Sequence, residues 1–134
     1  MKLTKATNYA LHTMMFLAVN PPDEHIGVAK LAERQGVSTT YLSKILTKLV
    51  KSGLVESVSG ANGGYKLKPD WEKLSLLDVI KAIEGLTPIF DYCHSHNPDC
   101  LIQKAIESAE EKLLNELNQT RIVDLANKLN ETSI

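Results

Sequence analysis

The sequence predicts a mainly α-helical (α+β) fold: a winged helix-turn-helix with a small β-hairpin wing and a long C-terminal dimerisation helix. Three observations lead to this fold class. Residues 28–51 have the pattern of two helices with a glycine at the turn, residues 54–68 that of two short strands around a glycine-rich loop, and residues 100–117 form a long amphipathic segment. Helix, turn, helix and hairpin in this order are typical of modules that bind double-stranded DNA.

The first predicted element is an amphipathic helix over residues 4–19. Apolar residues recur there at positions 6, 10, 14, 17 and 18, which is the spacing of one helix face. The segment Asn20-Pro21-Pro22-Asp23 ends this helix, because a proline inside a helix lacks the N–H that the helix needs.

The next two helices form the helix-turn-helix. Ala32 is small where two helices cross closely, and Gly36 can adopt the positive φ of the tight turn between them. Ser38 is a good N-cap for the second of these helices, and Gly53 is predicted to close its C-terminus. The inner stripe of that helix is apolar and consists of Leu42, Ile45, Leu46 and Leu49.

The outer face of the same helix carries residue types that contact DNA. Short hydroxyl side chains near its N-terminus suit base edges, and lysines further along suit phosphates. We therefore predict contacts from Ser38, Thr39, Thr40, Tyr41, Lys44 and Lys48, and we expect Thr39, Thr40, Tyr41 and Lys44 to read bases. A solvated helix face that contacts nothing is the simpler alternative.

The start of the first helix adds further candidates. Backbone N–H groups at a helix N-terminus, together with a lysine, can hold a phosphate. The predicted DNA-binding residues therefore include Lys2, Thr4, Asn8 and Tyr9, and the set also includes Val28.

A glycine-rich loop joins two short strands, residues 54–58 and 65–68, whose side chains alternate in character. Three glycines, a serine and an asparagine make this loop slim enough for a minor groove. Asn62-Gly63 is also a hairpin signal in its own right, so the glycines have a turn-forming role whether or not DNA is bound. The predicted contacts of the wing are Ser59, Gly60, Asn62, Gly63, Gly64, Tyr65 and Lys66.

The C-terminal half is predicted to be helical. Ser75 and Asp78 have the spacing of a capping box, with Asp in place of Glu, and open a helix that stops at Gly85. Residues 87–99 contain two prolines and no periodicity, which predicts a loop. The longest helix runs from Cys100 to about Leu117, and Thr120 is predicted to cap a last short helix.

We expect two regions: a DNA-binding domain over residues 1–70, and a helical dimerisation and sensing region over residues 71–134. A winged-helix core is expected to be complete by about Leu67, so the long helix must bury its apolar stripe elsewhere. Packing on its own domain is one solution. We favour a homodimer, because paired half-sites are the usual way for a small helix-turn-helix protein to gain affinity. The predicted interface consists of Leu101, Ala105, Ile106, Ala109, Leu113 and Leu117.

Charge is divided unevenly along the chain. Residues 1–68 hold nine Lys and Arg against four Asp and Glu, whereas residues 69–134 hold six against twelve. The N-terminal half is therefore basic, with a net charge of +5, and suits DNA phosphates, although the whole chain carries only −1. No apolar run approaches the roughly 18 residues of a membrane span, and no signal-peptide core is evident, so a cytoplasmic protein is predicted.

Several segments together resemble the Rrf2 family of bacterial transcription regulators. They are residues 2–4 with 9–11, Leu-Ala-Glu-Arg-Gln-Gly-Val-Ser at 31–38, Tyr41-Leu42, Gly-Gly-Tyr-Lys-Leu at 63–67 and Leu-Asp-Val-Ile-Lys-Ala-Ile-Glu-Gly at 77–85. The resemblance spans almost the whole chain in the right order. It implies a homodimeric winged-helix repressor whose recognition helix enters the major groove and whose wing reaches the minor groove.

The family includes members in which three cysteines between the wing and the long helix hold an iron–sulfur cluster. The corresponding loop of this sequence has only Cys93 and Cys100. A cluster is usually held by four cysteine thiolates, or by a mixed set in which other ligands replace some of them. The sequence is therefore similar to the cluster-free branch of the family, and no cofactor is expected.

The cysteine loop leaves three interpretations open. Cys93, His94, His96 and Cys100 are metal-ligand types, but their spacing matches no standard closed zinc site, so no metal is predicted. A thiol switch would use Cys100, because a helix N-terminus and Lys104 one turn on both stabilise a thiolate. In a reducing compartment, free thiols without a role also fit.

No nucleotide-binding glycine loop, nucleophile elbow or pair of catalytic carboxylates stands out, so no enzyme is predicted. The predicted function is a sequence-specific DNA-binding transcription regulator, a repressor that binds a palindromic operator as a homodimer. Its partners are double-stranded DNA and a second copy of itself, and a protein or small-molecule effector is compatible with it. The alternatives are a winged-helix protein-interaction module without DNA binding, and a thiol- or metal-responsive variant of the regulator.

Overall fold

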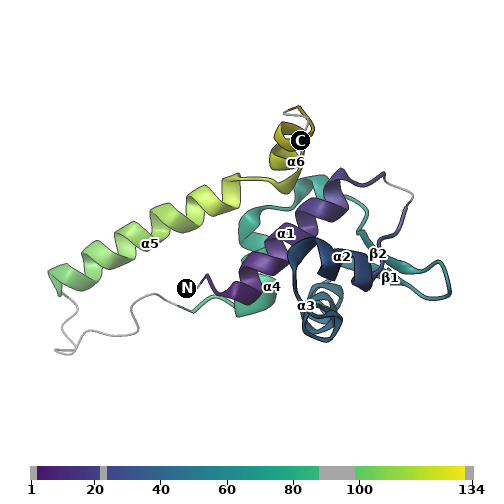
Figure 1. The fold of residues 1–134 in the computed structure, drawn as a ribbon. Coiled ribbons are helices and arrows are strands. Elements are labelled where there is room, and N and C mark those ends of the chain that lie inside the picture. The colour runs from purple at the N-terminus through teal and green to yellow at the C-terminus, as the bar shows by residue number, and fades with distance from the viewer. Residues whose placement is uncertain (1–2, 22–23, 88–98, 132–134) are drawn as a thin grey trace.

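The computed structural model describes residues 3–21, 24–87 and 99–131 and has the predicted winged helix-turn-helix fold (Figure 1). Its elements are α1 (Lys5–Val19), α2 (Val28–Gln35), α3 (Thr39–Lys51), β1 (Val55–Val58), β2 (Gly64–Leu67), the short 3₁₀ helix η1 (Trp71–Lys73), α4 (Leu76–Glu84), α5 (Leu101–Gln119) and α6 (Ile122–Glu131). Figure 1 shows α5 running away from the body that α1–α4 and the hairpin form. Element η1 is the one that the sequence pattern missed.

The turn between α2 and α3 forms as the sequence predicts. Gly36 is in the left-handed region at φ +66°, and its N–H closes α2 on the carbonyl groups of Ala32 and Glu33. The Ser38 hydroxyl then accepts a hydrogen bond from the Tyr41 backbone N–H at 3.1 Å, which caps α3. This turn fixes the direction in which the chain leaves α2 and enters the predicted recognition helix.

Two polar contacts hold α2 against α1. The Gln35 side-chain amide donates to the buried Thr13 hydroxyl at 2.8 Å, and the Arg34 guanidinium lies 5.5 Å from the centre of the Phe16 ring. A cation over an aromatic face is attracted by the electron-rich ring. These contacts join the first helix to the helix-turn-helix, so the three helices form one unit.

The β-hairpin is antiparallel, and its register pairs Val55 with Leu67 and Val58 with Gly64. The backbone of Ile26 forms two hydrogen bonds with Tyr65, at 3.0 and 2.8 Å, and so adds a short bridge on the other side of β2. The hairpin is thereby attached to the chain that enters α2, and the wing cannot move independently of the helix-turn-helix at that point.

The tip of the wing differs from the expected Asn-Gly turn. The Gly63 N–H donates to the Gly60 carbonyl at 3.0 Å, so Ala61 and Asn62 are the central residues of the turn. The positive φ angles of the loop belong to Gly60 (+107°) and Gly64 (+155°), not to Asn62 and Gly63. The type I′ turn that Asn-Gly favours would need positive φ at both of these residues, so the loop is longer than the dipeptide signal predicts.

The start of the C-terminal half is as predicted, because the capping box of Ser75 and Asp78 is present at the N-terminus of α4. The role predicted for Thr120 is wrong. Its hydroxyl donates backwards to the Glu116 carbonyl at 2.9 Å, so Thr120 closes α5, and α6 begins two residues later. Hydroxyl side chains next to a helix compete for its last carbonyl groups in this way.

The core extends past Leu67, contrary to the expectation that it is complete there. One apolar cluster joins α1–α3 and the hairpin with later residues, among them Leu74, Val79, Ile83 and Ile122. The inner face of α4 is therefore part of the winged-helix core, and α6 contributes the buried side chain of Ile122 to it. None of the described helices combines the length and the apolar character needed to span a membrane.

Candidate nucleic-acid interface

Helix α3 presents a polar face to solvent and buries its other face completely. Leu42, Ile45, Leu46 and Leu49 are at most 3% exposed. The predicted contact residues on the outer face are exposed: Ser38, Thr39, Thr40, Tyr41, Lys44 and Lys48. Lys44 and Lys48 form no ion pair within the described part of the chain. Their charges are thus available for phosphate groups, whereas the Ser38 hydroxyl is engaged in capping.

The rings of Tyr9 and Tyr41 connect α1 to α3. Their centroids are 5.7 Å apart and their planes meet at 85°, which is an edge-to-face contact. Tyr9 is half-buried against the core, and Tyr41 is 37% exposed. Both residues are predicted DNA contacts, and the structure brings their rings together. Tyr9 therefore has a supporting role under Tyr41 in addition to any contact of its own.

The start of α1 already holds an anionic group. The Thr4 hydroxyl accepts a hydrogen bond from the Thr7 N–H and donates to the Glu84 carboxylate, and the Thr7 hydroxyl donates to the same carboxylate oxygen at 3.0 Å. The Glu84 carboxylate thus engages both hydroxyl groups at the start of α1, and a phosphate contact there stays a prediction. Asn8 is exposed beside it, and Lys2 lies outside the described residues.

The wing residues divide into an exposed tip and a packed base. Ser59, Gly60 and Asn62 are exposed, whereas Gly63, Gly64, Tyr65 and Lys66 are half-buried. The Lys66 ammonium lies 3.8 Å from the carboxylate of Glu56, its cross-strand partner. Val28, at the first turn of α2, is also packed against the core. Slim exposed residues at the tip and anchored residues at the base suit a loop that enters a groove.

Helix α5 has no buried residue and packs against α4. The predicted interface residues fall into two groups. Ile106 and Leu117 are half-buried, on the side that α4 covers, while Leu101, Ala105, Ala109 and Leu113 are exposed. Ile102, which the predicted set does not contain, is 70% exposed beside Leu101 at 80%. The sequence signal for it is that it directly follows Leu101, a predicted interface residue.

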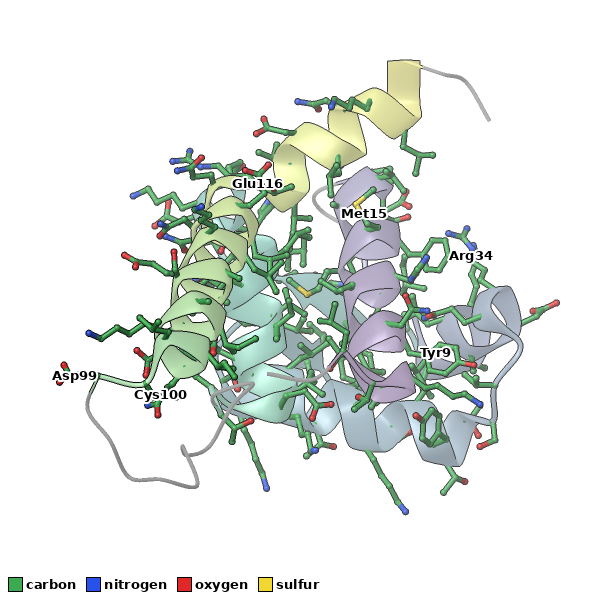
Figure 2. The ribbon with its side chains drawn as sticks, turned by 90° about the vertical axis from the view of Figure 1, so that its left-hand side faces the viewer. Tyr9, Met15, Arg34, Asp99, Cys100 and Glu116 are labelled. Atoms are coloured by element: carbon green, nitrogen blue, oxygen red, sulfur yellow. The ribbon has the colours of Figure 1, made fainter. Side chains whose placement is uncertain are left out.

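Cys100 is the N-cap residue of α5, is half-buried and is a free thiol. The Lys104 ammonium that was expected to favour its thiolate lies 3.7 Å from the Asp99 carboxylate (Figure 2 labels Asp99 and Cys100). Cys93, His94 and His96 lie outside the described residues. Among those described, no group of three or more His, Cys, Asp or Glu residues could hold a metal ion.

The family model Rrf2, described as an iron-dependent transcriptional regulator, matches residues 3–128. The chain belongs to the Rrf2 family. Family membership confirms the predictions of a DNA-binding transcription regulator and of a protein that is not an enzyme.

Solved structures of Rrf2-type regulators resemble the chain along nearly its whole length. CymR (YrzC), the global cysteine regulator of B. subtilis, is 25% identical, with 96% of this chain and 98% of that chain covered and a TM-score of 0.78. The oxidised form of CymR from Staphylococcus aureus is 28% identical, with 94% and 96% covered and a TM-score of 0.79. IscR from T. potens is 27% identical, with 100% and 92% covered and a TM-score of 0.81.

The family description names iron, so the donor set of this Rrf2 protein matters. The whole chain contains two cysteines, Cys93 and Cys100. Iron–sulfur clusters are held mainly by thiolates, and two thiolates fall one short of the three-cysteine arrangement described above. The residues present therefore do not fit a cluster of that kind.

Proposed function

We propose that this Rrf2-family protein is a repressor that binds a palindromic operator as a homodimer. The observation that carries the proposal is the outer face of α3, where exposed hydroxyl groups precede Lys44 and Lys48, whose ammonium groups pair with no carboxylate among the described residues. Hydroxyl side chains near the start of a recognition helix suit base edges, and lysines suit phosphates. Residues 1–70 would then bind DNA, and residues 71–134 would dimerise and receive a signal.

The homodimer is supported by the exposed apolar stripe of α5. Leu101, Ile102 and Leu113 are 80%, 70% and 39% exposed in the single chain. They share one side of the helix with Ala105 and Ala109 and lie next to the stripe that α4 covers. Covering this stripe with the same helix of a second copy removes the apolar surface from water and pairs two recognition helices, which explains a palindromic site.

Repression is the consequence that we infer from this architecture. A dimer that occupies an operator inside a promoter blocks access to that promoter.

The test is selection of bound sequences from a random DNA pool, followed by measurement of affinity for the best sequence by fluorescence anisotropy. We expect an inverted repeat, two chains per duplex, and an affinity that falls steeply as salt increases, because phosphate neutralisation releases counterions. A reporter gene under a promoter with this sequence should be silenced. A selected site without symmetry, or no selection at all, would contradict the proposal.

No iron–sulfur cluster is part of this function. Protein purified without oxygen is expected to contain no iron and no sulfide and to bind the operator fully. A brown preparation with stoichiometric iron and sulfide, whose loss changes operator binding, would overturn this point.

A thiol-responsive form of the same regulator is the second candidate. It is favoured by the position of Cys100 at the first turn of α5, where a modification would disturb the start of the proposed dimerisation helix. Operator binding by the wild type should then respond to hydrogen peroxide, and the response should disappear in Cys100→Ser. Equal binding of both proteins before and after oxidation would exclude this candidate.

A further inference from the structure

Helix α4 lies between the proposed dimerisation helix and the helix that supports the recognition helix. It contacts α5 on one side and α1 on the other (Figure 2), and its inner face belongs to the core. A difference in the position of α5 can therefore reach α1 and α3 through α4, and also through α6, which follows α5 in the chain and packs against α1.

The polar link between α4 and α1 is formed by Glu84, the last residue of α4. Its carboxylate accepts hydrogen bonds from the hydroxyl groups of Thr4, the N-cap of α1, and Thr7, which is fully buried. The carboxylate also lies at the positive end of the α1 dipole, where a negative charge is stabilised. Hydrogen bonds to a charged acceptor are stronger than those between neutral groups, so this link is well suited to fix the first turn of α1.

The first turns of α1 lead directly to the recognition helix. Tyr9 lies two residues after Thr7, and its ring meets the ring of Tyr41 edge to face. Tyr41 is in the first turn of α3, next to the exposed Thr39 and Thr40. A connected path thus runs from Glu84 to the Thr7 hydroxyl, along the backbone of α1 to Tyr9, and from the Tyr9 ring to Tyr41.

We propose that Glu84 is a positioning residue for DNA reading. It fixes the first turn of α1, and thereby the Tyr9–Tyr41 contact, relative to α4, the helix against which α5 packs. This inference rests on the proposed function, and it explains how the geometry of the dimer is conveyed to the recognition helix. Glu84 itself touches no DNA in this proposal. Its loss should therefore lower operator affinity while leaving the sequence-independent attraction to phosphates unchanged.

The experiment measures the affinity of the full-length protein for the selected operator and for a scrambled duplex at one salt concentration. Glu84→Ala is expected to weaken operator binding at least tenfold and to change binding to the scrambled duplex less than twofold. Glu84→Gln keeps an oxygen acceptor without the charge and should be intermediate. The matched control is Glu72→Ala, an exposed acidic residue of η1, which should bind like the wild type.

A second pair of variants guards against simple unfolding. Thr7→Val has nearly the shape of threonine but lacks the hydroxyl group, and Thr7→Ser retains it. We expect Thr7→Val to reproduce the operator-specific loss and Thr7→Ser to bind like the wild type. If Glu84→Ala does not fold, this pair decides the question.

The pathway through Tyr9 is tested by combining variants. In a Tyr9→Leu background, Glu84→Ala should cost less than threefold, because the contact that it positions is already gone. Additive losses, equal losses on both duplexes, or wild-type affinity of Glu84→Ala and Thr7→Val would each overturn the inference and leave the proposed function intact. Failure of the wild type to bind any operator would instead overturn the proposed function, and this inference with it.

Discussion

Ser75 and Asp78 cap α4 reciprocally: the Ser75 hydroxyl accepts from the Asp78 backbone N–H at 3.2 Å, and the Asp78 carboxylate accepts from the Ser75 backbone N–H at 2.9 Å. The N-terminus of α4 is also the place where the chain between α5 and α6 is attached to the core. The Leu76 N–H donates to the Thr120 carbonyl at 2.9 Å, and the Ile122 N–H donates to the Leu74 carbonyl at 3.0 Å. The capping box therefore stabilises the joint at which α5 and α6 are attached to the core.

Ser75→Ala is predicted to destabilise the protein by about 1 kcal/mol, because the Asp78 backbone N–H loses the hydroxyl that accepts its hydrogen bond and the Ser75 side chain is only 2% exposed. For a chain of this size the melting temperature should fall by roughly 3–6 °C. Thermal denaturation followed by circular dichroism measures this. The control Ser108→Ala, at an exposed position inside α5, should be neutral or slightly stabilising, since alanine has the best helix propensity. Equal melting temperatures for all three proteins would refute the capping role.

Gly64→Ala is predicted to destabilise the wing attachment. Gly64 has φ +155°, and an added Cβ would lie 2.6 Å from the backbone oxygen of Ile26, the bridge partner of β2. Strain and collision act together, so the loss should exceed 1 kcal/mol in urea denaturation, with weaker operator binding. Gly27→Ser provides the comparison, because nothing lies within 4 Å of a Cβ added at this position and serine can cap α2. A stable Gly64→Ala protein with full operator affinity would contradict this prediction.

The sequence was sufficient to predict features that local chemistry decides. Gly36, Ser38 and the Ser75–Asp78 capping box each act on neighbouring residues, and the structure has all three as predicted. Thr120 was misassigned because a hydroxyl between two helices can serve either, and the packing of α4 against the α5–α6 joint decides which one.

The site was less predictable wherever distant segments meet. The Glu84 carboxylate reaches Thr4 and Thr7, which are 80 and 77 positions away in the chain, and no local pattern signals such a contact. The separation of Ile106 and Leu117 from the exposed residues of α5 likewise depends on which side of the helix α4 covers. Periodicity identifies an apolar helix face but does not tell which part of that face packs within the chain.

The double variant Thr40→Ala, Lys44→Ala is predicted to weaken specific operator binding by about 1–3 kcal/mol for each residue that reads a base. Both side chains are exposed, so folding should be unaffected, and affinity for a scrambled duplex should change much less than affinity for the operator. Fluorescence anisotropy with both duplexes measures the difference. Lys128→Ala, an exposed lysine of α6, is the charge-matched control for Lys44→Ala. Unchanged specific affinity in the double variant would exclude this face of α3 from base reading.

Leu113→Asp is predicted to prevent dimerisation and to reduce operator affinity at least tenfold. Leu113 is 39% exposed in the single chain, so an aspartate there costs the monomer little, whereas in a dimer it would bury a charge without a partner. Sedimentation velocity at micromolar concentration should show monomers, while circular dichroism shows the wild-type helix content. Asn115→Asp adds the same charge to an exposed position outside the apolar stripe of α5 and should remain dimeric. A wild type that is monomeric at this concentration, or a Leu113→Asp dimer as tight as the wild type, would mean that the exposed face of α5 does not form the interface.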